Sequence, residues 1–119
     1  MGVFTVSVRI ASPAAPDRGT DVELLVDTGA TLTSLPRPIL ESLGVAPGMV
    51  RTFRVADGRR VRRETGTVLA TMDGVTMAIP VMFADQGDAP VLGATALDIL
   101  GFAVDPVEKK LIPRDLLAL

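Results

Sequence analysis

The sequence has no cysteine, histidine, tryptophan or tyrosine, and phenylalanine occurs only four times in 119 residues. Without cysteine and histidine the chain has no disulfides, no cysteine nucleophile, no histidine base and none of the usual zinc sites. Any catalysis must therefore use carboxylates, hydroxyls, lysine or arginine. We expect neither a metal nor an organic cofactor.

Long hydrophobic runs are missing as well. The apolar stretches fall far short of the ~20 residues that a membrane span requires. Residues 1–9 alternate apolar and polar side chains, unlike a signal peptide. The net charge of −2 points to no particular partner, and we expect no nucleic acid partner. We expect a cytoplasmic protein, without a membrane partner, that forms a single domain over residues 1–119.

The residue pattern predicts a mainly β chain with two short helices, arranged as a small closed barrel or a folded sheet. Asp57-Gly58 and Asp73-Gly74 are dipeptides typical of two-residue hairpin turns. Helices are expected over 36–43 and 94–100. Strands are expected over 3–10, 22–26, 31–35, 51–56, 60–72, 75–83, 91–92, 102–104 and 109–112.

Asp27 stands out because it directly follows the apolar run Leu24-Leu25-Val26. A carboxylate next to a core loses hydration, so a special environment is expected around it. The Thr28 hydroxyl can lock the loop by hydrogen bonds, and Gly29 lets the backbone N–H come close to the carboxylate. The same residues also fit an ordinary turn in which the aspartate caps the loop.

Several segments, in order, resemble the retropepsins, the retroviral type of aspartic protease. Asp27–Ala30 resembles their Asp-Thr-Gly-Ala signature, and Val55–Gly58 resembles the hairpin flap of bacterial members. Val91–Gly93, ahead of a short helix, is similar to the strand–glycine–helix unit that supports their active-site loop. The end of the chain, 102–112, also looks like theirs. The likeness covers roughly residues 3–113 and is greatest to stand-alone prokaryotic members.

The resemblance implies a single-lobe acid-protease barrel that works as a homodimer on extended peptides. Asp27 of each subunit would activate a water, with Thr28 and Gly29 supporting the active-site loop. Two carboxylates ~3 Å apart at an effective dielectric near 20 repel by roughly 5 kcal/mol, so the pair shares one proton. The residues expected to bind substrate are Ala30, Ala56, Asp57, Gly58 and Arg59.

Two other functions remain open at this point. A chain of the same fold could bind peptides or dimerise without cutting. An unrelated small β-barrel could use its arginine-rich hairpin to bind anionic partners. Cleavage of an unstructured protein favours a protease, whereas salt-sensitive nucleic acid binding favours the unrelated barrel.

Other charged or terminal residues have ordinary interpretations. The six arginines between Arg51 and Arg63 are read as a solvated hairpin, with Arg59 and Arg60 the candidates for any charge preference. Asp105 precedes a proline and is expected to form a turn. The apolar tail 115–119 either pairs with a second subunit or covers the core of its own.

Overall fold

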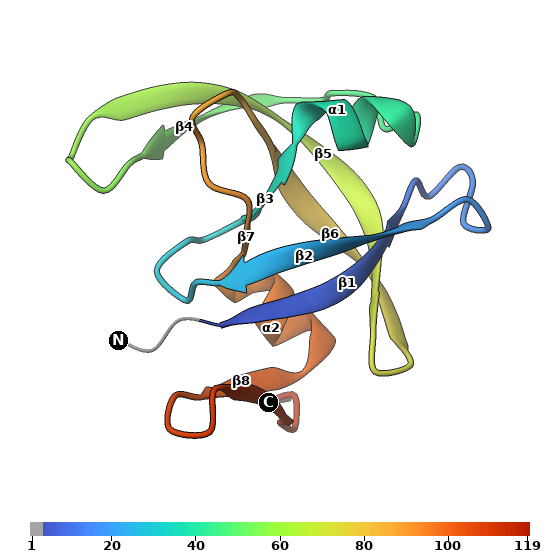
Figure 1. The fold of residues 1–119 in the computed structure, drawn as a ribbon, viewed down its shortest axis with the longest axis vertical. Helices are drawn as coiled ribbons and strands as arrows, with labels where there is room; N and C mark the ends of the chain where they lie inside the picture. Colours follow the sequence, from blue (N-terminus) through green and yellow to red (C-terminus); the bar gives the residue numbers. More distant parts are fainter. Residues whose placement is uncertain (1–3) are drawn as a thin grey trace.

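The structure, a computed structural model, describes residues 4–119 (Figure 1). The strands are β1 Thr5–Ala11, β2 Thr20–Val26, β3 Thr33–Pro36, β4 Val50–Arg54, β5 Arg60–Met72, β6 Val75–Ala84, β7 Val91–Leu92, β8 Phe102–Asp105 and β9 Lys110–Pro113. The helices are α1 Arg37–Ser42 and α2 Ala94–Leu100. The prediction of a mainly β chain with two short helices is therefore confirmed, although the start of the first predicted strand, Val3, lies outside the described residues. Neither described helix has the length and apolarity needed to cross a membrane.

Six of the strands form a closed ring. The pairings run β1–β2–β7–β3–β6–β5, and β5 returns to β1 through Arg9 opposite Thr71 and Ala11 opposite Leu69. This circuit forms the barrel seen in Figure 1. β4 pairs with the first part of β5 and projects beyond the ring, while β8 and β9 form a separate small sheet.

The barrel interior is filled by the alternating apolar residues of its strands. Val8 and Ile10 from β1 and Leu24 from β2 are fully buried, as are Val81 and Phe83 from β6. Because successive strand side chains point to opposite faces, this period-2 pattern directs one face of each strand inward. The core therefore lies inside the ring of strands.

The two Asp-Gly turns differ from each other. Asp73 and Gly74 both have positive φ between the paired residues Met72 and Val75, so they form the predicted two-residue turn. The prediction for Asp57-Gly58 is wrong by one residue. There the Val55 N–H donates to the Arg59 carbonyl and the Gly58 N–H to the Val55 carbonyl, which leaves a three-residue loop. A turn with one extra residue and glycine at positive φ also satisfies the hairpin twist.

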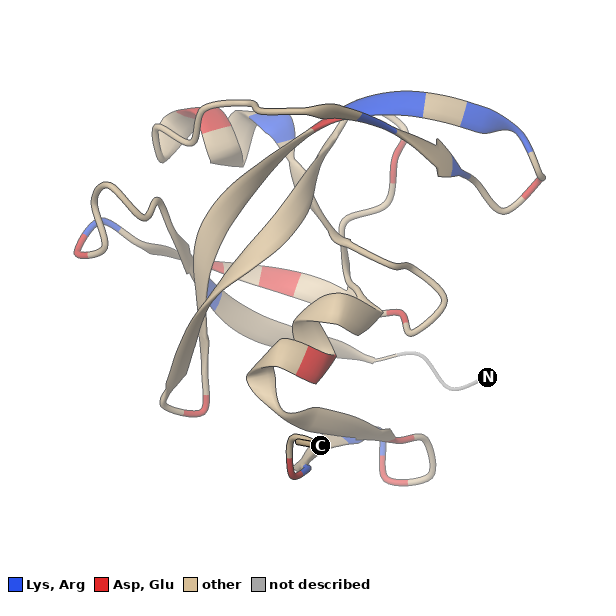
Figure 2. Cartoon of the chain, turned by 180° about the vertical axis from the view of Figure 1, so that it is seen from behind, with Lys and Arg blue, Asp and Glu red and all other residues tan. Residues whose placement is uncertain are grey.

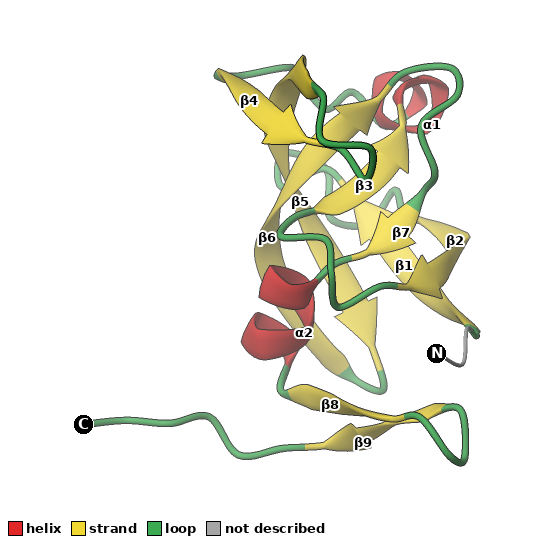
Figure 3. Ribbon diagram, turned by 90° about the vertical axis from the view of Figure 1, so that its left-hand side faces the viewer, coloured by secondary structure: helices red, strands yellow, loops and turns green. Residues whose placement is uncertain are grey.

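The C-terminal segment leaves the small sheet and runs away from the barrel (Figure 3). The Arg114 N–H donates to the Gly101 carbonyl at 2.8 Å, and beyond it Leu116, Leu117 and Leu119 are exposed. The tail therefore does not cover the core of its own chain.

We expect Phe83→Ala to lower the free energy of unfolding by about 3–5 kcal/mol, because it empties a fully buried aromatic site in the barrel. Phe53→Ala makes the same chemical change at the one half-buried residue of the otherwise exposed β4, outside the ring, and should cost less than about 1 kcal/mol. Urea denaturation of both variants measures the difference. Equal losses would contradict the assignment of the core to the ring.

Candidate active site

The Asp27 loop, residues 27–32, begins where β2 ends. The Asp27 N–H donates to the Leu92 carbonyl at 3.0 Å, which ties the start of the loop to β7. The Gly29 N–H donates to Asp27 Oδ1 at 2.9 Å. A backbone donor aimed at a carboxylate makes a charge-assisted bond that orients it. The contact between glycine and carboxylate expected from the sequence is present.

Gly29 also has little room for a side chain. A Cβ atom at this position would lie 3.1 Å from Asp27 Oδ1. Any side chain would therefore press on the oxygen that the Gly29 N–H holds. The glycine thus allows the carboxylate and the backbone donor to meet.

The unit formed by β7, Gly93 and α2 holds the other side of the Asp27 loop. The Ala94 N–H donates to the Ala30 carbonyl at 2.8 Å and the Thr95 N–H donates to the Thr31 carbonyl at 3.0 Å. The Gly93 N–H donates to the buried Thr33 hydroxyl at 3.1 Å. These bonds fix the loop to the first turn of α2.

A glycine is required at position 93 because two backbones approach each other there. A Cβ atom on residue 93 would lie 2.6 Å from both the carbonyl carbon and the carbonyl oxygen of Leu32, and 2.9 Å from the Ala30 oxygen. These neighbours are backbone atoms, so they cannot move aside without displacing the Asp27 loop.

A cleft of about 900 Å³ separates the Asp27 loop from the β4–β5 hairpin, residues 50–64, which we call the flap hairpin. Figure 1 shows the tip of this hairpin and the loop on the same side of the barrel. The expected site residues that line the cleft are Asp27, Gly29, Ala30, Ala56 and Arg59.

Three of the expected site residues are not on the cleft wall of a single chain. Thr28 is exposed on the outside of the Asp27 loop. Asp57 and Gly58 form the tip of the flap hairpin, where the Asp57 carboxylate accepts the Arg59 N–H at 3.0 Å and pairs with Arg59 Nε at 2.7 Å. These two bonds, the backbone one first, lower the pKa of Asp57. In one chain, Asp57 therefore stabilises the turn.

Sequence reasoning missed part of the cleft wall. The turn between β6 and β7 lies between two predicted strands and carries no expected site residue, yet Gly87, Asp88 and Ala89 line the cleft. Phe53 and Val61 line it from the flap hairpin. Val61 stands between Arg60 and Arg62, neither of which lines the cleft, and this alternation was a usable signal for its inward direction.

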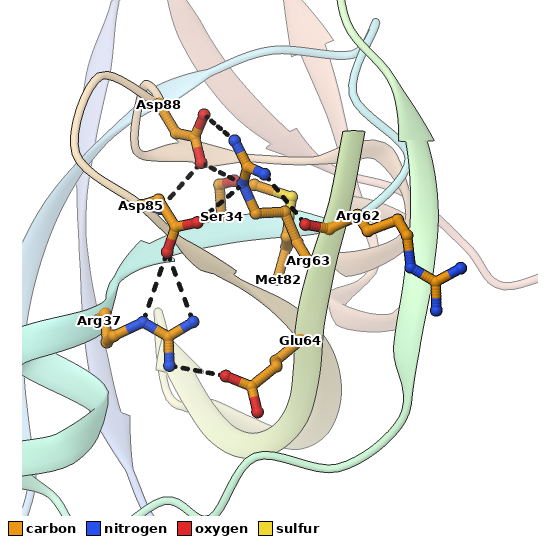
Figure 4. Close-up of polar contacts among 8 residues, drawn as sticks. All are labelled: Ser34, Arg37, Arg62, Arg63, Glu64, Met82, Asp85 and Asp88. Carbon is orange, nitrogen blue, oxygen red and sulfur yellow. Dashed lines mark hydrogen bonds and ion pairs between the residues drawn. The ribbon is translucent and has the colours of Figure 1, made fainter. Parts of the chain in front are cut away.

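A charged cluster connects the flap hairpin to this turn (Figure 4). Arg63 donates from Nε to Asp88 Oδ2 at 2.8 Å and from a terminal nitrogen to Asp88 Oδ1 at 3.2 Å. Asp88 Oδ2 also accepts the Asp85 N–H at 2.8 Å. Arg37, at the start of α1, pairs with Glu64 at 2.8 Å and with Asp85 at 3.4 Å. The interpretation of all six hairpin arginines as solvated is therefore wrong for Arg63.

The Arg63–Asp88 pair is the best shielded contact of this cluster. Their side chains are 20% and 18% exposed. The hydrogen bond from Arg63 is the largest cause that lowers the pKa of Asp88. A two-pronged bond between an arginine and a carboxylate fixes orientation as well as distance. It holds the base of the flap hairpin against the turn that lines the cleft.

The acidic groups do not form a metal site. Within residues 4–119 no three carboxylate side chains gather closely enough to hold a metal ion. The cleft wall of one chain includes two carboxylates, Asp27 and Asp88, and Arg63 engages Asp88. Asp27 is the cleft carboxylate that forms no ion pair in the described part of the chain.

A barrel with an Asp-Thr-Gly loop beneath a hairpin, and a cleft between them, defines a retropepsin-like aspartic protease fold. Residues 18–98 match the family described as "gag-polyprotein putative aspartyl protease", and the chain belongs to this family. The EIAV protease, solved in complex with the inhibitor HBY-793, has a similar structure with a TM-score of 0.62. The two are 24% identical, and the match covers 82% of this chain and 88% of the EIAV chain. No curated protein matches the sequence.

Gly93→Ala should lower the free energy of unfolding by about 2–3 kcal/mol, because the added methyl group meets backbone that cannot yield. Gly48→Ala is the matched control, since a Cβ there is 3.4 Å from its nearest neighbour, the Thr65 oxygen. It should change stability by no more than about 0.5 kcal/mol. Chemical denaturation compares the two, and a Gly93→Ala variant as stable as Gly48→Ala would refute the close approach.

Asp88→Asn should destabilise the chain by about 1–3 kcal/mol at neutral pH, because Arg63 loses its charged acceptor. The folded state lowers the pKa of Asp88, so its stabilisation is complete above the unfolded value of about 3.9 and disappears as pH falls through the folded value. The difference in the free energy of unfolding between wild type and variant should therefore become smaller in acid.

Urea unfolding at neutral pH and near pH 3 measures this difference. Asp73→Asn makes the same change on an exposed turn at positive φ, a conformation that asparagine adopts readily, and should leave stability unchanged. A difference that persists at low pH would show that the Asp88 charge does not contribute.

Proposed function

We propose that the protein is an aspartic endopeptidase in which two copies of this single-domain chain each contribute Asp27 to one active site. The observation that carries the proposal is that the Asp27 carboxylate lines the cleft with one oxygen held by the Gly29 N–H. The membership of the aspartyl protease family supports the reaction class.

One chain supplies one available carboxylate, and aspartic protease chemistry needs two. An ionised aspartate takes a proton from the attacking water while a protonated one donates to the carbonyl oxygen of the substrate. Two-fold symmetry supplies the second Asp27 from an identical loop. Because the paired carboxylates repel each other, they share one proton, and identical residues then serve as acid and base.

The outer residues of the loop and the tail suit this pairing. Thr28 is exposed beside Asp27, where its hydroxyl can reach the second chain across the symmetry axis. Leu116 and Leu117 are exposed apolar side chains, which gain by burial when two copies associate. We assign Thr28 and Gly29 to support of the paired loops.

The substrate is an extended peptide held between the Asp27 loop and the flap hairpin. Ala30 and Ala56 present small side chains to the cleft, which leaves room for substrate side chains. Arg59 lines the cleft beside the tip, and Asp57 and Gly58 shape the turn that closes over the peptide.

Asp27→Asn should leave a folded dimer without measurable cleavage of an unstructured protein, because neither amide can take the proton from water. Asp105→Asn is the matched control. Asp105 is the last residue of β8, and its carboxylate accepts the N–H groups of Val107 and Glu108 in the turn that follows. Gel-based cleavage assays with and without a statine-type inhibitor should show full, inhibitor-sensitive activity for this control.

Mixing experiments test whether the two chains share the site. Adding a several-fold excess of the Asp27→Asn variant to wild type should suppress activity, because most wild-type chains then pair with a variant chain. Retained activity in the pure variant would refute the catalytic role. Activity of a monomer at working concentration would refute the shared site, and binding without cleavage would indicate a peptide-binding module.

A further inference from the structure

The flap hairpin carries more positive charge than its own carboxylates neutralise. Arg59 is paired with Asp57 and Arg63 with Asp88. Figure 2 shows the basic residues along this hairpin. Those of its arginines that form no ion pair within residues 4–119 are Arg51, Arg54, Arg60 and Arg62.

The strand register places these charges against one another. Arg51 lies directly opposite Arg63, and Arg54 lies directly opposite Arg60. Like charges in opposed positions destabilise a hairpin. Asp88 relieves the first pair by engaging Arg63, which leaves the Arg51 charge uncompensated. An anionic group bound next to Arg51 would compensate this charge and reduce its repulsion with Arg63.

Arg51 belongs to the face of the hairpin that looks into the cleft. Side chains two residues apart in a strand share a face, so Arg51 shares one with Phe53. Both line the cleft, and so does Val61, which lies opposite Phe53. Arg62 belongs to the other face, and Figure 4 shows its guanidinium directed away from the Arg63 cluster.

The charge balance of the cleft favours an acidic ligand. Arg51 and Asp27 lie on its wall together, and Asp88 is already engaged by Arg63. Two arginines without an ion pair among the described residues lie on this wall, Arg51 and Arg54. Arg54 donates to the Gly58 carbonyl at 3.1 Å and so belongs to the hairpin turn. Asp27 is needed for the reaction, so the cation available to hold a substrate side chain is Arg51. Arginine pairs with carboxylates through two parallel hydrogen bonds, which provides selectivity as well as attraction.

We propose that Arg51 is a specificity-determining residue that selects peptides with an acidic side chain on each side of the scissile bond. The inference rests on the homodimeric endopeptidase proposed above, because a single peptide then meets one Arg51 from each chain. Two-fold symmetry places the two guanidinium groups on opposite sides of the paired Asp27 residues. The preference is electrostatic, so it weakens as salt concentration rises.

Binding to the Asp27→Asn variant tests the inference without relying on cleavage. The probes are fluorescein-labelled peptides of alanine, valine and serine with two glutamates placed symmetrically about the centre at increasing separation. Matched peptides carry glutamine instead. At the best separation we expect the glutamate peptide to bind at least about tenfold more tightly, measured by fluorescence anisotropy.

Substitutions assign the preference to Arg51. Adding Arg51→Gln should remove most of the difference between glutamate and glutamine peptides. Adding Arg51→Glu should reverse it, so that peptides with lysine at the same positions bind best, an outcome that a purely structural role cannot produce. Arg18→Gln, on the exposed loop between β1 and β2 and away from the cleft wall, should keep the full preference.

Cleavage by the active protein then separates the two proposals. Faster cleavage of glutamate peptides, with the preference lost in Arg51→Gln, supports both. Charge-selective binding without cleavage by wild type supports the role of Arg51 and refutes the endopeptidase. Equal binding of glutamate and glutamine peptides, or a preference that survives Arg51→Gln, overturns the inference. Salt-sensitive binding of single-stranded DNA without any peptide preference would overturn it as well.

Discussion

The approach of the Gly93 backbone to the Leu32 peptide is the contact on which the site depends. It brings the first turn of α2 close enough for its N–H groups to hold the carbonyls of Ala30 and Thr31. With that side of the loop fixed, the Gly29 N–H reaches Asp27 Oδ1. A short glycine contact thus positions a carboxylate that belongs to a different part of the chain.

Electrostatics then divides the acidic and basic groups of the cleft into two kinds. Arg63 and Asp88 neutralise each other and have a structural role, since they join the flap hairpin to the turn after β6. Among the described residues, Asp27 and Arg51 have no ionic partner on the cleft wall, and the third such group, Arg54, donates to the Gly58 carbonyl in the hairpin turn. Charges left unpaired in a concave site are the ones available to a ligand. The first is suited to chemistry and the second to recognition.

Local patterns in the sequence predicted much of this structure. The alternation of apolar residues located the strands, and the apolar run before Asp27 marked the loop that the structure places in the cleft. The span of α2 was predicted to the residue, because Gly93 and Gly101 bound a compact apolar segment. Such features depend on neighbours in the chain, which a single sequence displays.

What escaped prediction depends on residues far apart in the chain. Arg63 and Asp88 are separated by 25 residues, and nothing near either one indicates the other. The extra residue in the loop at Asp57 depends on the register of β4 against β5, which the dipeptide alone does not determine. The backbone contact at Gly93 likewise appears only once β7 lies between β2 and β3.

The position of β4 outside the ring has a dynamic consequence. Its hydrogen bonds belong to one ladder with β5, whereas the barrel strands are each held from both sides. The flap hairpin can move about the point where β5 joins the barrel without breaking any hydrogen bond between the barrel strands. The cleft can therefore open to a ligand while the barrel stays folded. Local opening of this kind lets amide protons near the hairpin tip exchange with solvent far sooner than those of β1.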